Sequence, residues 1–242
     1  MPSTSKAAYK RVLLKLSGEA LMGEQKFGIE YRACQHIAQA IKEVYALGVQ
    51  MGIVVGGGNI FRGSQAQSFG FDRTPADHIG MLATTINGLV LQQTLASLGV
   101  ESRIMSALNT DSIIEPYHWG HALHSLQKGI ILIFVGGTGN PYFTTDSAAA
   151  LRASEIQAEI FLKATKVDGI FSEDPKKNSQ AKKFDQLTYS EVFAKKLNVM
   201  DATAIALCRE NQIPICVFNL FEQGAMFKVV CGQKKGSLIL GE

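Results

Sequence analysis

Short apolar runs alternate with longer amphipathic stretches along almost the whole chain, and this alternation limits the fold more than any other feature. The apolar runs predict strands at residues 12–16, 51–55, 102–105, 130–135, 160–164 and 215–218, with a last edge strand at 238–240. The amphipathic stretches predict helices at residues 30–47, 77–98, 119–127, 146–158, 190–196 and 201–211. Strand, crossover helix, strand is typical of an α/β fold in which helices cover both faces of a largely parallel sheet.

The predicted helix ends carry residues that suit them. Gly48 and Gly99 follow apolar-periodic stretches and are expected in the left-handed conformation that often ends a helix. Asp146, Ser190 and Asp201 stand where N-caps are expected, although Ser190 is too close to Glu191 for the usual capping box. The least regular segments are residues 63–76, 109–117 and 173–187, and such loops often close over ligands.

Size and composition indicate a folded protein. A chain of 242 residues suits one large α/β domain, residues 1–242, better than two small ones. Hydrophobic residues make up 46% and charged residues 19%, which argues against disorder. The longest apolar run, residues 130–135, is far shorter than the roughly 20 residues of a membrane helix. The first residues, MPSTSKAAYKR, lack a secretory signal, so we expect a cytoplasmic protein without a membrane partner.

The cysteines and the charge exclude other classes. Cys34, Cys208, Cys216 and Cys231 form no CxxC pair, which favours buried reduced thiols over metal ligands or disulfides. The net charge of +3 is mild, and we interpret the cluster at Lys176, Lys177, Lys182 and Lys183 as a solvated loop rather than a nucleic-acid site.

Glycine-rich turns follow three separate predicted strands, in VLLKLSGE (12–19), IVVGGGNIFRG (53–63) and ILIFVGGTGNPYFTTD (131–146). Neither GK[ST] nor GxGxxG is present, so both common nucleotide fingerprints are missing. Glycine lets backbone N–H groups approach phosphate oxygens and adopt positive φ. A single turn of this kind is explained by tight turning alone. Three glycine-rich turns at the carboxyl ends of parallel strands predict one shared phosphate-binding crevice.

Charged side chains accompany these turns. Lys15 lies inside an apolar strand, which is costly unless its ammonium group meets an anion; the alternative is a lysine at a sheet edge that extends to solvent. Arg62 is either a phosphate ligand or an ordinary surface arginine. Asp77 and Asp146 are each expected to begin a helix, where N-capping alone explains an aspartate.

Two polar segments complete the pattern. Thr138, Asn140, Thr144 and Thr145 all follow the third strand, and together they suit a sugar, base or phosphate. The stretch KATKVDGIFSEDP (163–175) predicts a loop that presents an aromatic ring to a base, although its turn dipeptides are common.

Five collinear stretches resemble those of bacterial uridylate kinases, in the amino acid kinase superfamily: KLSGEAL (15–21), VVGGGNIFRG (54–63), DHIGMLAT (77–84), GTGNPYFTTDSAAALRA (137–153) and KATKVDGIFSEDP (163–175). The resemblance implies a three-layer αβα sandwich, a homohexamer, and phosphoryl transfer from ATP to UMP with Mg²⁺ in pyrimidine nucleotide synthesis. It implies that ATP contacts Lys15, Leu16, Ser17, Gly18, Gly58, Arg62, Thr165, Phe171 and Asp174. It implies that UMP contacts Gly57, Asp77, Thr138, Gly139, Asn140, Pro141, Tyr142, Phe143, Thr144 and Thr145.

Roles follow from that resemblance and from phosphoryl-transfer chemistry, which needs charge neutralisation more than covalent catalysis. Lys15 would neutralise the transferred phosphoryl group, and Arg62 would bind the phosphates on either side. Asp77 would bind the UMP ribose, and Asp146 would orient the lysine or assist the metal. Asp201 belongs either to the same polar cluster or to a helix cap. Gly57 would face UMP and Gly58 would face ATP.

The resemblance also includes an effector segment. GTP activation in many relatives is associated with the stretch that matches Gly23, Glu24, Gln25, Lys26, Phe27 and Gly28, and Arg103 matches a basic effector contact. Gln92, Ala96 and Ile130 are uncharged where relatives are basic, and UTP inhibition is a further open point.

Other functions remain as alternatives. A kinase of small carboxylates or carbamate would share the fold, but a small acid needs no ribose contact at Asp77. A nucleotide-bound storage or regulatory protein would not need Lys15, Arg62, Asp146 and Asp174 together. An NAD-dependent dehydrogenase is disfavoured because GxGxxG and its acidic partner are absent.

Overall fold

The central feature of the fold is one mostly parallel sheet. The computed structural model describes residues 6–63, 68–110, 112–175, 177–178 and 180–241. Within them, nine strands form a sheet in the order β4-β3-β5-β2-β1-β6-β10-β11-β9, and only β10 and β11 pair antiparallel. The strands are β1 Arg11–Leu16, β2 Gln50–Val55, β3 Ser102–Ser106, β4 Glu115–Pro116, β5 Ile131–Val135, β6 Ile160–Thr165, β9 Gln186–Thr188, β10 Ile215–Asn219 and β11 Ser237–Leu240. A separate antiparallel ribbon pairs β7 (Ile170–Phe171) with β8 (Lys183–Phe184).

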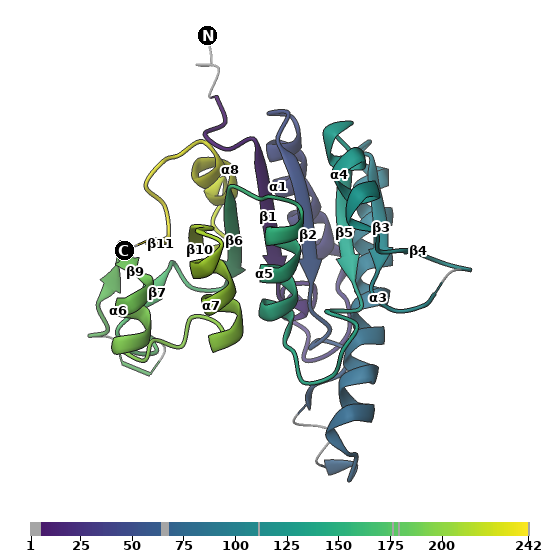
Figure 1. Cartoon of the computed structure of the whole chain (residues 1–242), viewed down its shortest axis with the longest axis horizontal. Helices are drawn as coiled ribbons and strands as arrows, with labels where there is room; N and C mark the ends of the chain where they lie inside the picture. Colours follow the sequence, from purple (N-terminus) through teal and green to yellow (C-terminus); the bar gives the residue numbers. More distant parts are fainter. Residues whose placement is uncertain (1–5, 64–67, 111, 176, 179, 242) are drawn as a thin grey trace.

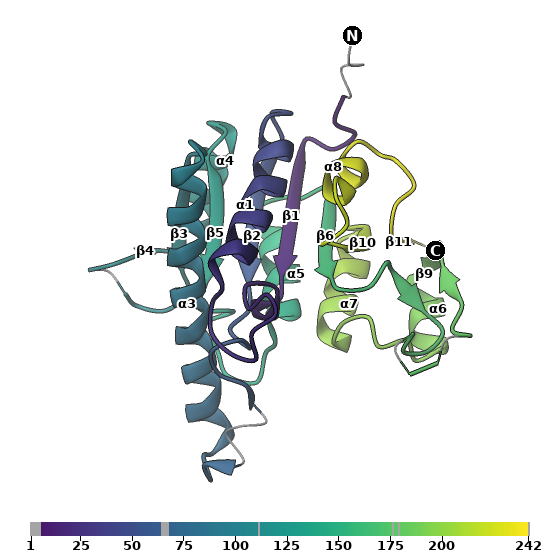
Figure 2. The ribbon, with the colours of Figure 1, turned by 180° about the vertical axis from the view of Figure 1, so that it is seen from behind.

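Helices cover both faces of the sheet (Figures 1 and 2). One face carries α1 (Tyr31–Tyr45), α3 (Arg73–Ser97) and α8 (Ala225–Val230). The other carries α4 (Trp119–Gln127), α5 (Thr145–Glu155) and α7 (Ala202–Glu210), with α6 (Tyr189–Ala194) in the same core layer. A short 3₁₀ turn, Gly18–Ala20, follows β1. The predicted three-layer αβα sandwich is therefore confirmed.

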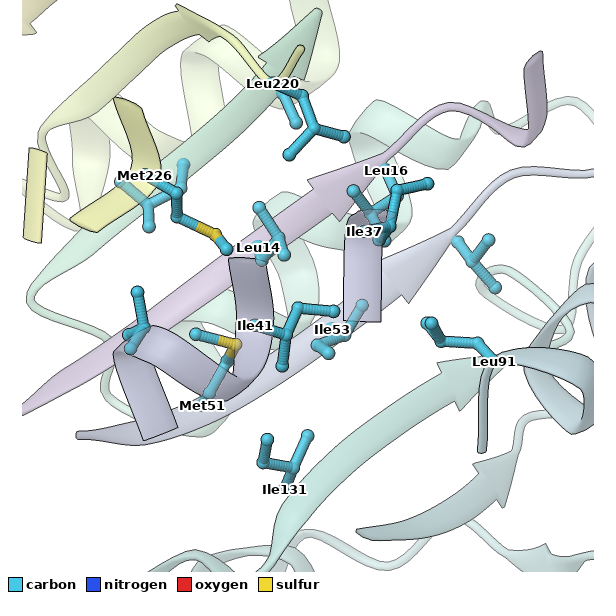
Figure 3. Packing of buried hydrophobic residues seen from close by; sticks show 14 of the residues in the cluster. Leu14, Leu16, Ile37, Ile41, Met51, Ile53, Leu91, Ile131, Leu220 and Met226 are labelled. Atoms are coloured by element: carbon cyan, nitrogen blue, oxygen red, sulfur yellow. The ribbon is translucent and has the colours of Figure 1, made fainter. Parts of the chain in front are cut away.

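Strand alternation decides which side chains face which helix layer. In β1, Val12, Leu14 and Leu16 pack toward α1 and α8, whereas Leu13 packs toward α5. Figure 3 shows the first layer, in which Leu14 and Leu16 lie beside Ile37 and Ile41 of α1. Because side chains alternate along a strand, Lys15 shares the face of Leu13 and points toward the α5 layer.

The predicted strands are confirmed, but one sheet position was wrong. The strand at Ser237–Leu240 is not an edge strand, because it pairs with β10 on one side and β9 on the other. The edge strand is β9, whose QLT sequence has no apolar run for a periodicity argument to detect. The two-residue strands β4, β7 and β8, the short helix α8 and the 3₁₀ turn also escaped prediction for lack of length.

Three helix starts differ from prediction. Helix α3 begins at Arg73, so Asp77 lies in its second turn; Pro75 is tolerated because the first helical turn needs no backbone donor. Thr144, not Asp146, caps α5 by accepting from the N–H groups of Asp146 and Ser147. Helix α6 is capped by Thr188 in a capping box with Glu191. The cap expected at Asp201 is confirmed.

Smaller expectations also have outcomes. Gly48 and Gly99 have φ of 75° and 74° after their helices, as predicted. Cys34, Cys208 and Cys216 are buried free thiols, whereas Cys231 is only partly buried. Of the lysine cluster, Lys183 belongs to β8, and Lys176 lies outside the described residues, as do residues 64–67, 111 and 179 of the irregular segments. No helix in the described part of the chain is both long and apolar enough to cross a membrane.

Candidate active site

The three glycine-rich turns converge, as the sheet topology requires. Parallel strands β1, β2 and β5 lie side by side, so their carboxyl ends share one edge of the sheet. The N–H group of Gly56 donates to the carbonyl of Leu16 at 2.9 Å, which ties the first two turns together. The N–H group of Gly136 donates to the Thr84 hydroxyl at 2.8 Å, which ties the third turn to α3.

Each glycine of the central GGG turn has a different environment. A Cβ on Gly56 would lie 3.1 Å from the nitrogen of Gly18, and a Cβ on Gly57 would lie 2.6 Å from the carbonyl oxygen of Gly80 in α3. A Cβ on Gly58 would meet nothing within 4 Å. The three are absent from the described residues with positive φ, so close approach rather than backbone conformation requires glycine at position 57 and leaves little room for a side chain at position 56.

The same turn carries a buried pair of amides. Asn59 Nδ2 donates to Asn87 Oδ1 at 3.0 Å, and Asn87 Nδ2 donates back to Asn59 Oδ1 at 2.7 Å. Asn87 also donates to the carbonyl of Gly56, and Asn59 also donates to that of Gly28. This reciprocal pair, which we call the amide pair, joins the turn to α3. It was not identified from the sequence.

A cluster of two lysines and one aspartate lies at the centre of this edge. Lys15 of β1 and Lys163 of β6 are register partners, and both face the α5 layer. Asp146, in the first turn of α5, places Oδ1 2.9 Å from Lys15 Nζ and Oδ2 2.7 Å from Lys163 Nζ. The three side chains are only 12–15% exposed, so Asp146 holds two nearly buried ammonium groups side by side.

Lys163 is the main site residue that sequence reasoning missed. It interrupts an apolar strand as Lys15 does, so the same burial argument applied to it would have found it. Its Nζ donates to the carbonyl oxygen of Val199 as well as to Asp146. This second bond directs the ammonium group between α5 and the start of α7.

Asp201 joins the edge of this cluster while it caps α7. Its carboxylate accepts from the Ala204 N–H group at 2.8 Å and from the Ser147 hydroxyl at 2.9 Å. The Thr144 hydroxyl also donates to it. The two interpretations of Asp201 are therefore compatible, because one carboxylate performs both roles.

Burial and the neighbouring opposite charges have opposite effects on the pKa values of Asp146 and Lys163. Burial alone would raise the pKa of Asp146, but Lys15 and Lys163 outweigh it and hold that pKa below its ordinary value. Burial also lowers the pKa of Lys163, and the attraction of Asp146 and Asp201 only partly compensates. Asp146 is therefore ionised at neutral pH, and Lys163 loses its proton more easily than a solvated lysine does.

One cavity, here called the α3 cavity, opens beside this cluster with a volume of about 260 Å³. Asp77 accepts from the backbone N–H of Tyr142 at 2.7 Å and from Arg73 Nε at 2.7 and 2.9 Å. The guanidinium of Arg73, a second residue that was not predicted, lies 5.2 Å from the Tyr142 ring centroid. The lining residues are Gly57, Gly58, Phe61, Gly63, Arg73, Ala76, Asp77, Gly80, Met81, Thr84, Gly137, Thr138, Asn140, Phe143, Thr144 and Thr145.

The α3 cavity gathers part of the predicted acceptor set. Thr138, Asn140, Phe143, Thr144 and Thr145 line it, whereas Gly139, Pro141 and Tyr142 are not among its lining residues. The Tyr142 ring is 65% exposed, and its contribution is the backbone N–H bound by Asp77. Gly57 and Gly58 both line this cavity, and the assignment of Gly57 to UMP and of Gly58 to ATP stays a prediction.

A second cavity, here called the β7 cavity, has a volume of about 520 Å³. It contains Lys163 together with Thr165, Phe171 and Asp174, three residues that the resemblance assigned to ATP. Its remaining lining residues are Val167, Gly169, Ile170, Ser172, Glu173, Pro175, Lys196, Leu197, Asn198, Val199 and Val217. Lys163 lines the β7 cavity, and Asp146 directly follows Thr145, which lines the α3 cavity, so the lysine–aspartate cluster lies between residues of the two cavities.

Arg62 and the first turn are linked to each other. Arg62 Nη2 lies 3.0 Å from Glu19 Oε1, and its Nε donates to the Gly58 carbonyl at 3.0 Å. The Ser17 hydroxyl accepts from the Glu19 N–H at 3.3 Å. This bond fixes the start of the 3₁₀ turn, Gly18–Ala20, that follows Leu16. Both members of the Arg62–Glu19 pair are nearly half exposed, so an incoming phosphate can replace the carboxylate at little cost.

The predicted effector residues are not brought together. Gly23, Glu24 and Gln25 line an open cavity of about 830 Å³ with Glu30, Arg32, Ala33, His36, Lys166, Asn219 and Phe221. Lys26, Phe27 and Gly28 are not among its lining residues, and Gly28 binds Asn59 instead. Arg103 is exposed on β3, which lies at the far side of the sheet from β10 and does not reach this cavity.

Comparison with known proteins places this site in a family. A sequence profile described as the amino acid kinase family matches residues 10–219. The chain is similar to a uridylate kinase of Protochlamydia amoebophila (strain UWE25), with 62% identity over 87% of this chain and 84% of that protein. It is also similar to the crystal structures of UMP kinase from Bacillus anthracis (TM-score 0.94, 42% identity, 97% of each chain) and from Ureaplasma parvum (TM-score 0.90, 37% identity, 96% of this chain and 98% of the other). The chain therefore belongs to the amino acid kinase family.

Proposed function

We propose that this protein is a UMP kinase, which transfers the γ-phosphoryl group of ATP to UMP and yields UDP and ADP for CTP and UTP synthesis. The observation that carries the proposal is the Lys15–Asp146–Lys163 cluster, in which Lys163 lines the β7 cavity and Asp146 directly follows Thr145 of the α3 cavity. The named activities of the uridylate and UMP kinases that this chain resembles support it.

The cluster supplies what this reaction needs. The acceptor is already a phosphate, so no protein nucleophile has to form, and catalysis rests on positioning and charge neutralisation. The ammonium groups of Lys15 and Lys163 neutralise charge on the oxygens of the transferred group. Asp146 fixes both groups through separate carboxylate oxygens, so it acts as a positioning residue.

The α3 cavity suits UMP, and the β7 cavity suits ATP. Asp77 offers carboxylate oxygens to the ribose hydroxyls, and the 138–145 segment offers hydroxyl and amide groups to base and phosphate. Phe171 offers a ring to adenine, with Thr165 and Asp174 beside it. Leu16, Ser17, Gly18, Gly58 and Arg62 would approach the ATP phosphates.

Mg²⁺ is a further part of the proposal. Among the described residues there is no group of three or more His, Cys, Asp or Glu side chains that would hold a metal by themselves. Mg²⁺ commonly binds through one or two carboxylates and substrate phosphates, and this donor set fits that mode. Asp146 and Asp201 would supply the carboxylates, and the ion would neutralise phosphate charge when bound.

Assembly, regulation and location extend the proposal. We expect residues 1–242 to act as one domain in a cytoplasmic homohexamer. The exposed side chains of Leu82 and Ile86 on α3, 51% and 49% accessible, suit a contact between copies. GTP as activator and UTP as inhibitor remain proposals.

A coupled assay of ADP formation tests the function. Mg-ATP would be offered with UMP, CMP, dUMP, carbamate or aspartate in turn, and turnover with UMP is expected. Acyl-phosphate formation from carbamate or aspartate would favour the small-acid kinase. Tight ATP binding without turnover on any acceptor would favour storage or regulation.

A further inference from the structure

A third cavity, here called the lysine cavity, lies away from both substrate cavities. It has a volume of about 340 Å³ and shares no described lining residue with the α3 or β7 cavity. Ile160 begins β6, so this cavity lies toward the amino end of that strand, whereas Thr165 lies at its carboxyl end. The lining residues are Tyr9, Ile160, Lys183, Asp185, Gln186, Cys216, Val229, Gly232, Gln233, Lys234, Lys235, Gly236 and Leu238.

The charge around this cavity is unbalanced toward cations. Lys235 Nζ lies 2.5 Å from Glu222 Oε2, and Lys183 Nζ lies 3.5 Å from Asp185 Oδ1, where the Asp185 side chain is 94% exposed. Lys234 has no ion pair or hydrogen bond within the described residues. The lining therefore carries three lysines and one carboxylate, because Glu222 lines a different cavity, and the pair with exposed Asp185 is weak enough to be replaced by a stronger anion.

The loop that carries two of these lysines is held in place. A Cβ on Gly236, whose φ is 78°, would lie 2.3 Å from the carbonyl oxygen of Val217. The thiol of Cys216 donates to the carbonyl oxygen of Lys235 at 3.5 Å. The close approach of the Gly236 backbone and the hydrogen bond from Cys216 both hold the loop against β10. The lysines therefore extend from a defined backbone position.

The rest of the lining is suited to an organic molecule. Ile160, Val229 and Leu238 supply apolar surface, and Tyr9 supplies a ring. Gln186 and Gln233 supply amide groups that both donate and accept hydrogen bonds. A volume of about 340 Å³ is in the range of small-molecule sites, which run from about 300 to 1,000 Å³.

We propose that the lysine cavity binds a phosphorylated small molecule that carries an apolar or aromatic portion. The phosphate oxygens would accept from the ammonium groups of Lys183, Lys234 and Lys235, and the organic portion would lie against Ile160 and Leu238. Lys183 of β8 also pairs with Phe171 of β7, so the ligand would lie one strand from the β7 cavity.

Calorimetry with phenyl phosphate and inorganic phosphate tests this assignment. The full-length protein is first saturated with ADP and UMP, whose own binding is measured separately, so that the α3 and β7 cavities are occupied. Phenyl phosphate is expected to bind one remaining site and to bind more tightly than inorganic phosphate. Lys234→Gln is expected to weaken it about tenfold or more, and Lys234→Arg much less, because the charge-assisted bond is retained.

Controls separate this result from general charge effects and misfolding. Lys195→Gln removes an exposed lysine just after α6 and outside the cavity, and it is expected to leave phenyl phosphate affinity unchanged. Circular dichroism and the ADP affinity check that Lys234→Gln is folded. Absence of binding to the saturated protein would overturn the proposal, as would equal weakening by Lys234→Gln and Lys195→Gln. Equal affinity for phenyl phosphate and inorganic phosphate would overturn the assignment of an organic ligand.

Discussion

The α3 and β7 cavities, with the lysine–aspartate cluster between residues of their linings, are formed by different kinds of structural element. The α3 cavity is bounded by a 25-residue helix, by glycine backbone packed against that helix, and by Asp77 bound to two partners. Most of the lining of the β7 cavity comes from the two-residue strand β7 and from the loops 172–175 and 196–199, with Lys163 and Thr165 of β6 and Val217 of β10 at its base. Rigid elements position groups more sharply than loops do, so we expect stricter selection of the acceptor than of the donor.

The largest effect is expected at Lys15 of the lysine–aspartate cluster. Lys15→Ala should lower kcat at least ~100-fold, because it removes one of the two ammonium groups that we propose to neutralise the transferred phosphoryl group. UMP and ATP should still bind, since the walls of both cavities remain. Steady-state kinetics and equilibrium binding measure this, with Lys195→Ala as a matched exposed control. An unchanged rate would show that Lys15 does not neutralise charge in the transition state.

Substitutions at Gly57 and Gly58, which both line the α3 cavity, should differ in their effect on stability. Gly57→Ala should lower the free energy of unfolding by about 1–3 kcal/mol, because its Cβ would meet the Gly80 carbonyl at 2.6 Å. Gly58→Ala should change that free energy by less than about 0.5 kcal/mol, since the space there is open. Denaturant unfolding measures both. Equal destabilisation by the two changes would contradict the packing argument.

Selection of the acceptor should depend on Asp77. Asp77→Asn is expected to raise the KM for UMP roughly tenfold, because it removes a charged hydrogen-bond acceptor, and to leave the KM for ATP unchanged. Glu43→Gln, an exposed carboxylate-to-amide change on α1, serves as the control. A parallel rise in both KM values would remove the distinction between the cavities.

A smaller effect is expected on the donor side. Phe171→Ala should raise the KM for ATP only about fivefold, since an aromatic contact adds roughly 1 kcal/mol beyond its buried area. The KM for UMP should not change. Phe193→Ala, on α6 and outside the cavity, is the matched control. If Phe171→Ala altered UMP rather than ATP kinetics, the assignment of the two cavities would be reversed.

The pH dependence of activity tests the lysine–aspartate cluster. A loss of charge there should affect the use of UMP and of ATP alike. Because burial lowers the pKa of Lys163, its ammonium charge is lost as pH rises through a value below the ordinary 10.5, and kcat should fall there. Arginine stays protonated to above about pH 12, so Lys163→Arg should shift this decline to higher pH. Lys163 alone would favour folding as pH rises through that window, because its folded form binds fewer protons than its unfolded form. Burial raises the pKa values of Cys34, Cys208 and Cys216, which favours unfolding over the same range, so kcat rather than stability is the quantity to measure. An alkaline limit that Lys163→Arg does not shift would exclude Lys163 as its cause.

Much of the fold was predictable because it depends on patterns that repeat. Six buried strands and the helices between them follow from apolar runs and helical spacing, and the convergence of the glycine turns follows from parallel topology. Strands of two or three residues carry no period, so β4, β7, β8 and β9 were not predicted. The sheet position of β11 depends on β9 and was wrong for the same reason.

The site was predictable where a residue conflicts with its surroundings. Lys15 was recognised because a lysine in an apolar strand needs a partner, and Asp146 proved to be that partner. Lys163 met the same criterion but lay at the start of a stretch interpreted as a loop. Arg73 could not be found, because its importance arises from the earlier start of α3, which places it one turn before Asp77.

The amide pair of Asn59 and Asn87 has a consequence for how the site responds to its surroundings. Two neutral amides bind each other without any titrating group, so their contact is insensitive to pH and is hardly screened by salt. The charges and ion pairs of Lys15, Lys163 and Asp146, in contrast, depend on both pH and salt. Changes of pH or salt should therefore alter the charges of the lysine–aspartate cluster while the glycine turn keeps its shape.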